Sequence, residues 1–313
     1  MTFWEKWCII EKTEQVGKSR FKGEYMRVFE MCSSINGKYL IAGEFEKQIQ
    51  IWDTECNEKI CDIKTHFLGG GKRLTVSNSG KYFSAVNYGR YGIELYSTEN
   101  HMLLWQNKTI KQIQCVYFSA DDSILYAINN DGKLYSLSVS DGNIESIEKN
   151  IRYLFLSESG MLKLSKTNEL IYGALKIPSS DFNYCDIYPA DEVFYYSLYG
   201  AKGLFCCDAA GTVLWHNTKT TGNIIEIAYN KEHHFISAID KRVSPDADTN
   251  FNYYICSFEA DTGKLLYSEK IQCDKNTYCF AFADNGKKLI TNAGTVLVYY
   301  DTKWHVSSIK YEF

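Results

Sequence analysis

The sequence is poor in several features that would point to particular protein classes. Its 313 residues include only 3 prolines and 5 methionines. It also lacks any run of about 18 apolar residues, the length needed to cross a bilayer. The formal net charge of −4 gives no basic surface of the kind that nucleic-acid-binding proteins use. We therefore expect a protein that binds neither a membrane nor nucleic acid.

The N-terminus lacks the pattern of a secretion signal. Its opening stretch, MTFWEKWCIIEKTEQ, contains several acids and only a short apolar patch. The 11 cysteines are odd in number and scattered, and several lie inside apolar runs. Without a signal sequence, we interpret them as reduced, buried thiols in a cytoplasmic protein.

Aromatic residues are abundant. They make up 15% of the chain, with 24 tyrosines and 17 phenylalanines, and hydrophobic residues as a whole reach 45%. Tyrosine and phenylalanine favour half-buried pleated surfaces, so this composition favours β-strands. The length would allow two average domains, but β-propellers and barrels often exceed about 200 residues as one unit.

A unit of two short apolar runs separated by a polar turn recurs along the chain. Residues 34–44 followed by 48–60 form one such unit, and 120–132 followed by 133–146 form another. The first turn of each unit is marked by a residue 32 to 54 positions from the next: Gly37, Gly80, Ser123, Gly160, Glu192, Glu232 and Gly286. A period near 40 with strand–turn–strand content is typical of propeller blades of about four strands.

The repeat predicts an all-β fold, a single β-propeller spanning residues 1–313 with about four antiparallel strands per blade. We expect seven blades. Six is the alternative, because the unit at 161–178 ends in a poorly patterned stretch. Within the N-terminal segment 1–23, residues 4–12 are a candidate outer strand that closes the ring, and 304–313 compete for the same position.

The first unit resembles a WD-repeat blade. Residues 34–43 supply a turn, a strand and a small residue, and 49–54 supply a strand that ends in Trp-Asp. Residues 298–302, VYYDT, repeat that ending with tyrosine in place of tryptophan. The Gly-His pair that opens a typical WD repeat is missing from the units. The resemblance implies a propeller fold and an interaction role, and no particular activity.

Middle units are similar to the repeats of quinoprotein-like propellers, as in residues 211–215 and 260–267. Members of that family that use pyrroloquinoline quinone hold it against a disulfide between adjacent cysteines, beside calcium. That resemblance makes Cys206-Cys207 a candidate redox site. A strand places successive side chains on opposite faces, however, and a cytoplasmic setting opposes oxidation. We interpret both residues as structural and expect no cofactor.

Other local patterns fail as sites. Residues 246–250 begin like a calcium loop, but the glycine and the glutamate required further along are absent. Residues 69–72, GGGK, lack the spacing of a phosphate-binding loop. The six histidines show no zinc-site spacing, and no nucleophile elbow is present. We assign no catalytic and no metal-binding residue.

The remaining candidates lie on the hairpins between the second and third strands of each blade, which should share one face of the ring. Tyrosine and arginine dominate binding hot spots, and loops on rigid scaffolds often carry function. The predicted partner-binding residues are Tyr88, Arg90, Tyr91, Tyr199, Lys202 and Arg242. We predict a non-catalytic, monomeric scaffold that binds a protein partner. The alternative is a propeller enzyme (a hydrolase, lactonase or quinoprotein-like enzyme) with its site at the central channel.

Overall fold

The structure of the chain is a computed structural model. It describes residues 28–34, 37–44, 48–67, 73–87, 89, 91–157, 160–173, 175–178, 184–198, 200–245, 251–271, 279–284, 286–292, 296–300 and 303–306. Every helix or strand assigned in these ranges is a β-strand. The described part of the chain contains no helix of the length and hydrophobicity needed to cross a membrane.

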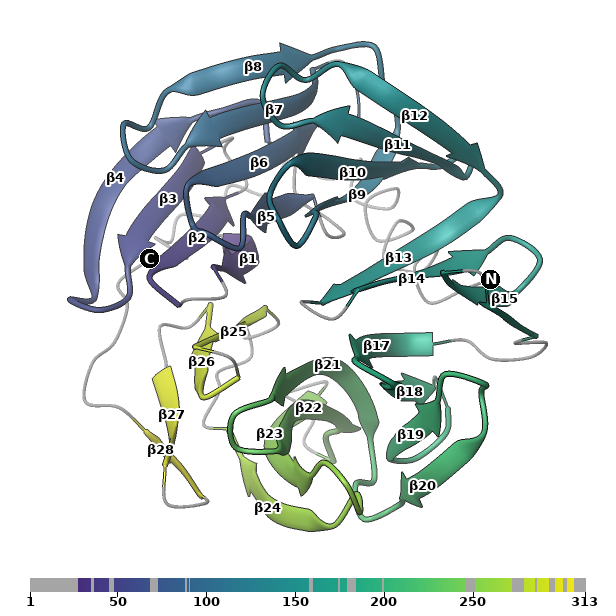
Figure 1. Cartoon of the computed structure of the whole chain (residues 1–313). Coiled ribbons are helices and arrows are strands. Elements are labelled where there is room, and N and C mark those ends of the chain that lie inside the picture. The colour runs from purple at the N-terminus through teal and green to yellow at the C-terminus, as the bar shows by residue number, and fades with distance from the viewer. Residues whose placement is uncertain are drawn as a thin grey trace.

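The strands form seven four-stranded antiparallel sheets arranged as the blades of a propeller (Figure 1). Each blade is one continuous segment, because the strands of every sheet follow the order of the chain. Blades 1 to 3 consist of β1 (Val28–Ser33), β2 (Tyr39–Glu44), β3 (Gln48–Asp53), β4 (Glu58–Lys64), β5 (Leu74–Val76), β6 (Tyr82–Asn87), β7 (Gly92–Ser97), β8 (Leu103–Asn107), β9 (Ile113–Phe118), β10 (Ile124–Asn129), β11 (Lys133–Ser138) and β12 (Ile144–Lys149).

Blades 4 to 7 repeat this arrangement around the rest of the ring. They consist of β13 (Ile151–Ser157), β14 (Gly160–Ser165), β15 (Glu169–Tyr172), β16 (Leu175–Pro178), β17 (Tyr184–Ala190), β18 (Val193–Leu198), β19 (Leu204–Asp208), β20 (Val213–Asn217), β21 (Asn223–Asn230), β22 (Phe235–Val243), β23 (Phe251–Glu259), β24 (Leu265–Lys270), β25 (Phe280–Ala283), β26 (Lys288–Thr291), β27 (Val296–Tyr300) and β28 (Lys303–Val306). In each blade the first strand lies nearest the centre of the ring and the fourth lies at its edge (Figure 1).

The seven turn markers chosen from the sequence all lie in or beside the connection between the first and second strands of a blade. The prediction of a propeller with about four strands per blade is therefore confirmed. The poorly patterned stretch at 161–178 belongs to a complete fourth blade, whose outer strands β15 and β16 have only four residues each. Strands this short carry too few alternations for the pattern to show clearly in the sequence.

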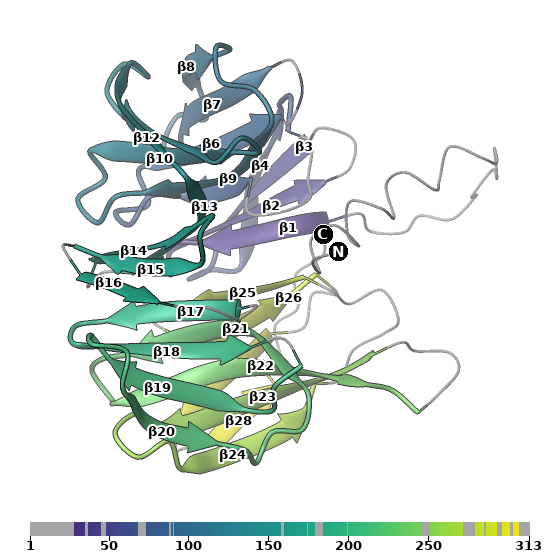
Figure 2. The same cartoon turned by 90° about the vertical axis from the view of Figure 1, so that its right-hand side faces the viewer.

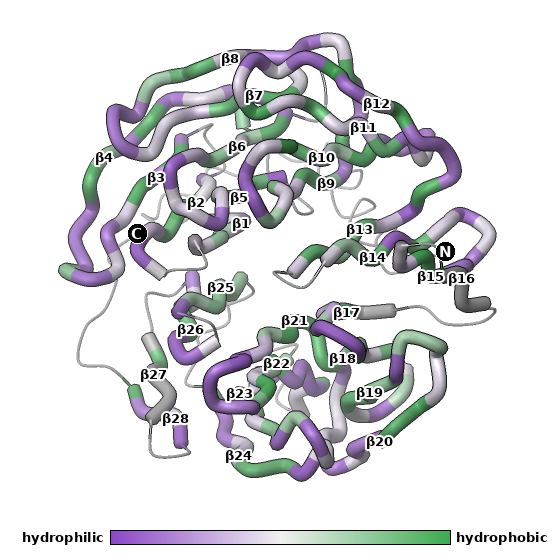
Figure 3. Tube along the Cα trace, viewed as in Figure 1, coloured by the Kyte–Doolittle hydropathy of each residue, from purple (hydrophilic) through white to green (hydrophobic). Residues whose placement is uncertain are grey.

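The hydrophobic core is divided among the interfaces between blades. Each buried cluster joins residues of two neighbouring blades, and together the clusters occupy every interface around the ring. Ile51 of blade 1, for example, packs with Phe83 and Tyr96 of blade 2. Figure 3 shows the same division, with apolar strand segments alternating with polar turns around the ring. Each blade thus buries both faces of its sheet, which explains why the inner strands read as apolar throughout.

The adjacent cysteines on β19 face opposite interfaces. Cys206 packs against residues of blade 6, including Ile224, whereas Cys207 packs against residues of blade 4, including Leu162. Both are buried free thiols. Burial, together with the charge of Asp208, raises the pKa of each thiol to about 12. The expected placement of the two side chains on opposite faces of one strand is confirmed, and a strand that points the two sulfurs apart cannot join them.

Two tryptophans on outer strands tie one blade to the next. The Trp105 indole N–H donates to the Val139 carbonyl at 2.8 Å, and the Trp215 indole N–H donates to the Ala260 carbonyl at 3.1 Å. Each ring lies against a glycine of the following blade, Gly142 or Gly263, where an added Cβ would collide with it. These glycines are needed because the indole ring approaches the backbone closely.

The ring closes where blade 7 meets blade 1. A cluster that includes Met31, Leu40 and Ile290 fills this interface, and the Lys288 ammonium donates to the Thr54 carbonyl at 2.9 Å. The outermost strand of blade 7 is β28, which includes residues 304–306. Part of the segment 304–313 therefore supplies the outer strand for which 4–12 and 304–313 were both candidates. The rival segment 4–12 lies outside the described residues.

Candidate functional site

The candidate site is the loop face, which we define as the side of the ring that carries the connections between second and third strands and those from each blade to the next. Antiparallel strands in chain order place these two kinds of connection at the same end of the sheet. In the edge-on view of Figure 2, the β22–β23 hairpin extends beyond the other blades on this side.

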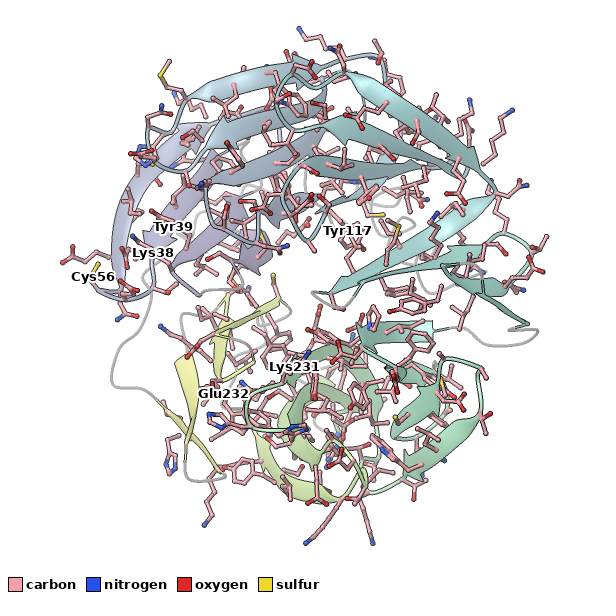
Figure 4. The ribbon with its side chains drawn as sticks, in the orientation of Figure 1. Lys38, Tyr39, Cys56, Tyr117, Lys231 and Glu232 are labelled. Atoms are coloured by element: carbon pink, nitrogen blue, oxygen red, sulfur yellow. The ribbon has the colours of Figure 1, made fainter. Side chains whose placement is uncertain are left out.

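The opposite face carries the turns between first and second strands and between third and fourth strands. Lys38, Cys56, Lys231 and Glu232 belong to these turns and are labelled in Figure 4. Ion pairs join neighbouring blades here, as between Lys231 and Asp191 at 2.7 Å. Glu232 likewise meets the Lys287 ammonium at 3.0 Å. These charges therefore bridge blades within the fold.

The structure places three of the six predicted partner-binding residues. Tyr91 lies in the β6–β7 connection and Lys202 in the β18–β19 connection, both on the loop face. Arg242 lies within β22, which continues through Val243, and so belongs to a strand of the hairpin and not to its turn. The other three, Tyr88, Arg90 and Tyr199, lie outside the described residues, and their role stays a prediction.

Arg242 braces the base of the β22–β23 hairpin. Its Nε donates to a carboxylate oxygen of Asp240 at 2.8 Å, and its guanidinium lies 3.6 Å from the ring centroid of Tyr254. Asp240 is fully buried and also accepts the backbone N–H of Gly222 at 3.0 Å. Burial of a carboxylate is costly unless it is paired, so this arrangement fixes the hairpin relative to the connection from blade 5.

The far end of the same hairpin is apolar and exposed. Val243 pairs with Phe251 across the two strands, and their exposed fractions are 80% and 41%. The Lys241 ammonium lies 3.8 Å from the centroid of the Phe251 ring. The hairpin thus carries an apolar pair away from a rigid base.

A second feature of the loop face is a histidine held in place by a buried carboxylate. His66 Nδ1 lies 2.5 Å from Glu94 Oε1, and the His66 backbone N–H donates to Glu94 Oε2 at 3.1 Å. The side chain of His66 is 42% exposed, whereas that of Glu94 is only 3% exposed. The imidazole also stacks on Tyr91, with 3.7 Å between ring centroids and 15° between planes.

Glu94 receives two further hydrogen bonds. The Tyr96 hydroxyl donates to Oε2 at 2.9 Å, and the Gln106 amide donates to Oε1 at 2.9 Å. Burial and the neighbouring carboxylate raise the pKa of Tyr96, so its hydroxyl remains a donor. A carboxylate that accepts several hydrogen bonds can stay charged inside a protein. Glu94 is accordingly a fixed acceptor behind the exposed imidazole.

The backbone around His66 is anchored on both sides. The Asn87 amide donates to the His66 carbonyl at 2.6 Å. Phe67 is fully buried and lies over Gly43 of β2, where an added Cβ would collide with its ring. Of the described residues in this connection, His66 is the one that is not buried.

Sequence reasoning missed the pairing of His66 with Glu94. The two residues are 28 positions apart, and the histidine shows no metal-site spacing. One signal was present: the third strand of blade 2, GIELYS at 92–97, is buried throughout and contains a glutamate. A carboxylate in such a strand needs a partner, and this could have prompted a search for one.

Blade 5 also has a stacked histidine, but it lies on the outer strand β20. His216 stacks on Phe205 with 3.7 Å between ring centroids and 9° between planes, and Phe205 stacks in turn on Tyr196. The His216 Nε2 atom lies 2.8 Å from the backbone carbonyl of Lys202. This histidine therefore meets an aromatic ring and a carbonyl oxygen.

Within the described ranges, no group of three or more histidine, cysteine, aspartate or glutamate side chains is arranged to hold a metal ion. Comparison with known proteins found no family model that matches the chain and no curated protein that is significantly similar to it. The fold of the chain is a β-propeller, and the contacts described above place its candidate binding residues on the loop face.

Proposed function

We propose that this propeller is a non-catalytic interaction module that binds a protein partner through its loop face. In this proposal it acts as a cytoplasmic monomer without a cofactor, in the manner of the WD-repeat-like propellers that its first unit resembles. The observation that carries the proposal is the exposed pair of Val243 and Phe251 at the end of the braced β22–β23 hairpin.

Two physical arguments support this role. Large apolar side chains that project from a rigid base cost little entropy to immobilise and gain free energy when a partner buries them. Aromatic residues surrounded by polar neighbours are also typical of binding hot spots. Arg242 and Asp240 provide the rigid base, and Lys241 lies beside the aromatic ring.

The proposal is tested by affinity capture from the native lysate, with the captured proteins identified by mass spectrometry. The wild type is compared with a variant carrying Val243→Ser and Phe251→Ser, and with one carrying Tyr88→Ala, Arg90→Ala and Tyr199→Ala. We expect both variants to lose the partner retained by the wild type, with thermal stability nearly unchanged.

The matched control is Leu214→Ser on β20, which changes a side chain of 54% exposure at the edge of the ring. This variant should retain the partner. If both loop-face variants capture the same proteins as the wild type, the loop face is not the binding surface and the proposal is wrong.

A further inference from the structure

The orientation of His66 suggests which chemistry the loop face recognises. We infer that His66 is the contact for a carboxylate side chain on the partner, so that the partner presents an acidic peptide segment to blade 2. This inference rests on the proposed function and adds a recognition residue and a class of ligand to it.

Among the described residues, only one ring nitrogen of His66 has a hydrogen-bond partner. Nδ1 is occupied by Glu94 at 2.5 Å, and no described residue forms a hydrogen bond with Nε2. The imidazole is 42% exposed and stacks on Tyr91, and the His66 backbone is held at both its N–H and its carbonyl. A side chain fixed in this way loses little entropy when it binds a ligand.

An imidazole cation favours an acidic ligand. When the imidazole is protonated, it donates one N–H to Glu94 and carries a second N–H at Nε2. A hydrogen bond from that cationic N–H to a carboxylate is shorter and stronger than one to a neutral acceptor. The titratable groups of the described residues that contact the imidazole or its carboxylate are Glu94, Tyr91 and Tyr96.

His216 in blade 5 provides an internal contrast. It also stacks on an aromatic ring at 3.7 Å, but its Nε2 is occupied by the Lys202 carbonyl, and a phenylalanine stands beside it. Aromatic stacking alone therefore does not create the feature seen at His66. Of these two histidines, only His66 has a buried carboxylate at one ring nitrogen and no partner among the described residues at the other.

The test uses a phage-displayed library of random peptides, selected on the full chain at pH 6. We expect the retained peptides to share an aspartate or glutamate. Affinity for a synthetic peptide of that sequence should fall roughly tenfold or more in His66→Gln, the loss expected for one charge-assisted hydrogen bond. The matched control His216→Gln should bind within about twofold of the wild type, because no such bond is removed.

One further measurement keeps the inference testable if His66→Gln folds poorly. The same peptide with asparagine or glutamine in place of its acid should bind the wild type weakly, because an amide is a weaker acceptor than a carboxylate for a cationic N–H.

Different failures have different meanings. Peptides without acids that bind His66→Gln as well as the wild type, but are lost in the Val243→Ser/Phe251→Ser variant, would overturn the role of His66 and leave the loop face as the binding surface. Peptides that bind equally to every loop-face variant would overturn the proposed function as well. Acidic peptides that bind as tightly after their acid is replaced by an amide would also contradict the inference, because the carboxylate would then be irrelevant.

Discussion

Blades 2 and 5 share a set of contacts between their third and outer strands, which we call the frame. They differ in the side chains that pack beside it. A glycine with positive φ begins β7 and immediately precedes β19, Gly92 at 71° and Gly203 at 93°. In both, an added Cβ would collide with a backbone carbonyl of the outer strand, that of Asn107 or Asn217. Both outer strands also dock a tryptophan onto a glycine of the next blade. The frame is thus set by glycine, asparagine and tryptophan at matching positions.

The residue two positions after this glycine differs between the blades. Blade 2 has Glu94, which bonds to Gln106 and His66, whereas blade 5 has Phe205, which stacks on His216. The same backbone therefore accommodates either a hydrogen-bonded network or an aromatic stack. The aromatic stack needs only side chains of suitable volume. The hydrogen-bonded network requires a partner for every buried polar group. We accordingly expect the hydrogen-bonded network of blade 2 to be more sensitive to substitution than the aromatic stack of blade 5.

The largest effect is expected for Glu94→Ala. This change leaves the His66 N–H, the Tyr96 hydroxyl and the Gln106 amide without their acceptor, and it opens a cavity beside them. Removal of one member of a buried charged network typically costs roughly 3–5 kcal/mol. Urea denaturation monitored by tryptophan fluorescence measures the loss. Phe205→Leu in blade 5, an apolar change of modest size, should cost about 1 kcal/mol. Equal losses would contradict the comparison.

Substitution of the frame glycine should be nearly as damaging. Gly203→Ala both strains a backbone at positive φ and pushes a methyl group into the Asn217 carbonyl. We expect a loss of about 2–4 kcal/mol from strain and overpacking together. The matched control is Gly200→Ala, where φ is also positive at 81° but nothing lies within 4 Å of the added Cβ. It should cost only about 1 kcal/mol, the strain alone. Thermal unfolding of both variants checks the difference.

A pH effect should distinguish the thiols of blade 5 from the residues that replace them in blade 2. Where blade 2 has Leu95 and Tyr96, blade 5 has Cys206 and Cys207, and burial raises the pKa of both thiols from 9.0 to about 12. Above pH 9 the unfolded chain releases these protons while the folded chain keeps them, so the free energy of unfolding falls as the pH rises from 9 towards 12. Below pH 9 these thiols contribute no slope.

The variant Cys206→Val/Cys207→Val checks this effect. Its free energy of unfolding should decline less steeply between pH 9 and pH 11 than that of the wild type, in urea titrations at each pH. Identical slopes would show that the two thiols titrate alike in the folded and unfolded chains.

The smallest effect is a gain in stability. Thr220 follows Asn217 by three positions, as Ile110 follows Asn107, and both side chains are buried. No partner for the Thr220 hydroxyl is found among the described residues. Thr220→Val keeps the shape and removes the unsatisfied group, so it should stabilise the chain by about 1 kcal/mol. A shift of the thermal midpoint upward supports this, and a shift downward would mean that the hydroxyl is satisfied.

The turn chemistry of the chain made most of the fold predictable. Turn residues such as Gly37, Gly80 and Gly286 act through their own backbone conformation, with φ values of 69°, 72° and 78°. A property that acts locally is visible in a local pattern. The opposed directions of Cys206 and Cys207 could be predicted for the same reason, since side chains alternate along any strand.

The site was less predictable, because its contacts join residues that are distant in the sequence. Arg242 was chosen as a displayed residue, yet it bonds to Asp240 and stacks on Tyr254 once the hairpin forms. His66 is one of the six histidines without zinc-site spacing in the sequence, yet it meets Glu94 across 28 positions. A residue type indicates what a side chain can do, and its neighbours decide whether it is displayed or used within the fold.

The sequence by itself determined a repeating β architecture, because strand propensity and turn residues act over a few neighbouring positions. Tertiary structure alone decided which polar residues face solvent, which are buried in pairs, and which hairpin projects from the ring. The physical reason is that burial is a property of the packed blades. Glu94 is buried because blade 1 covers one side of its strand and blade 3 the other, and His66 is held in place because Glu94 is there.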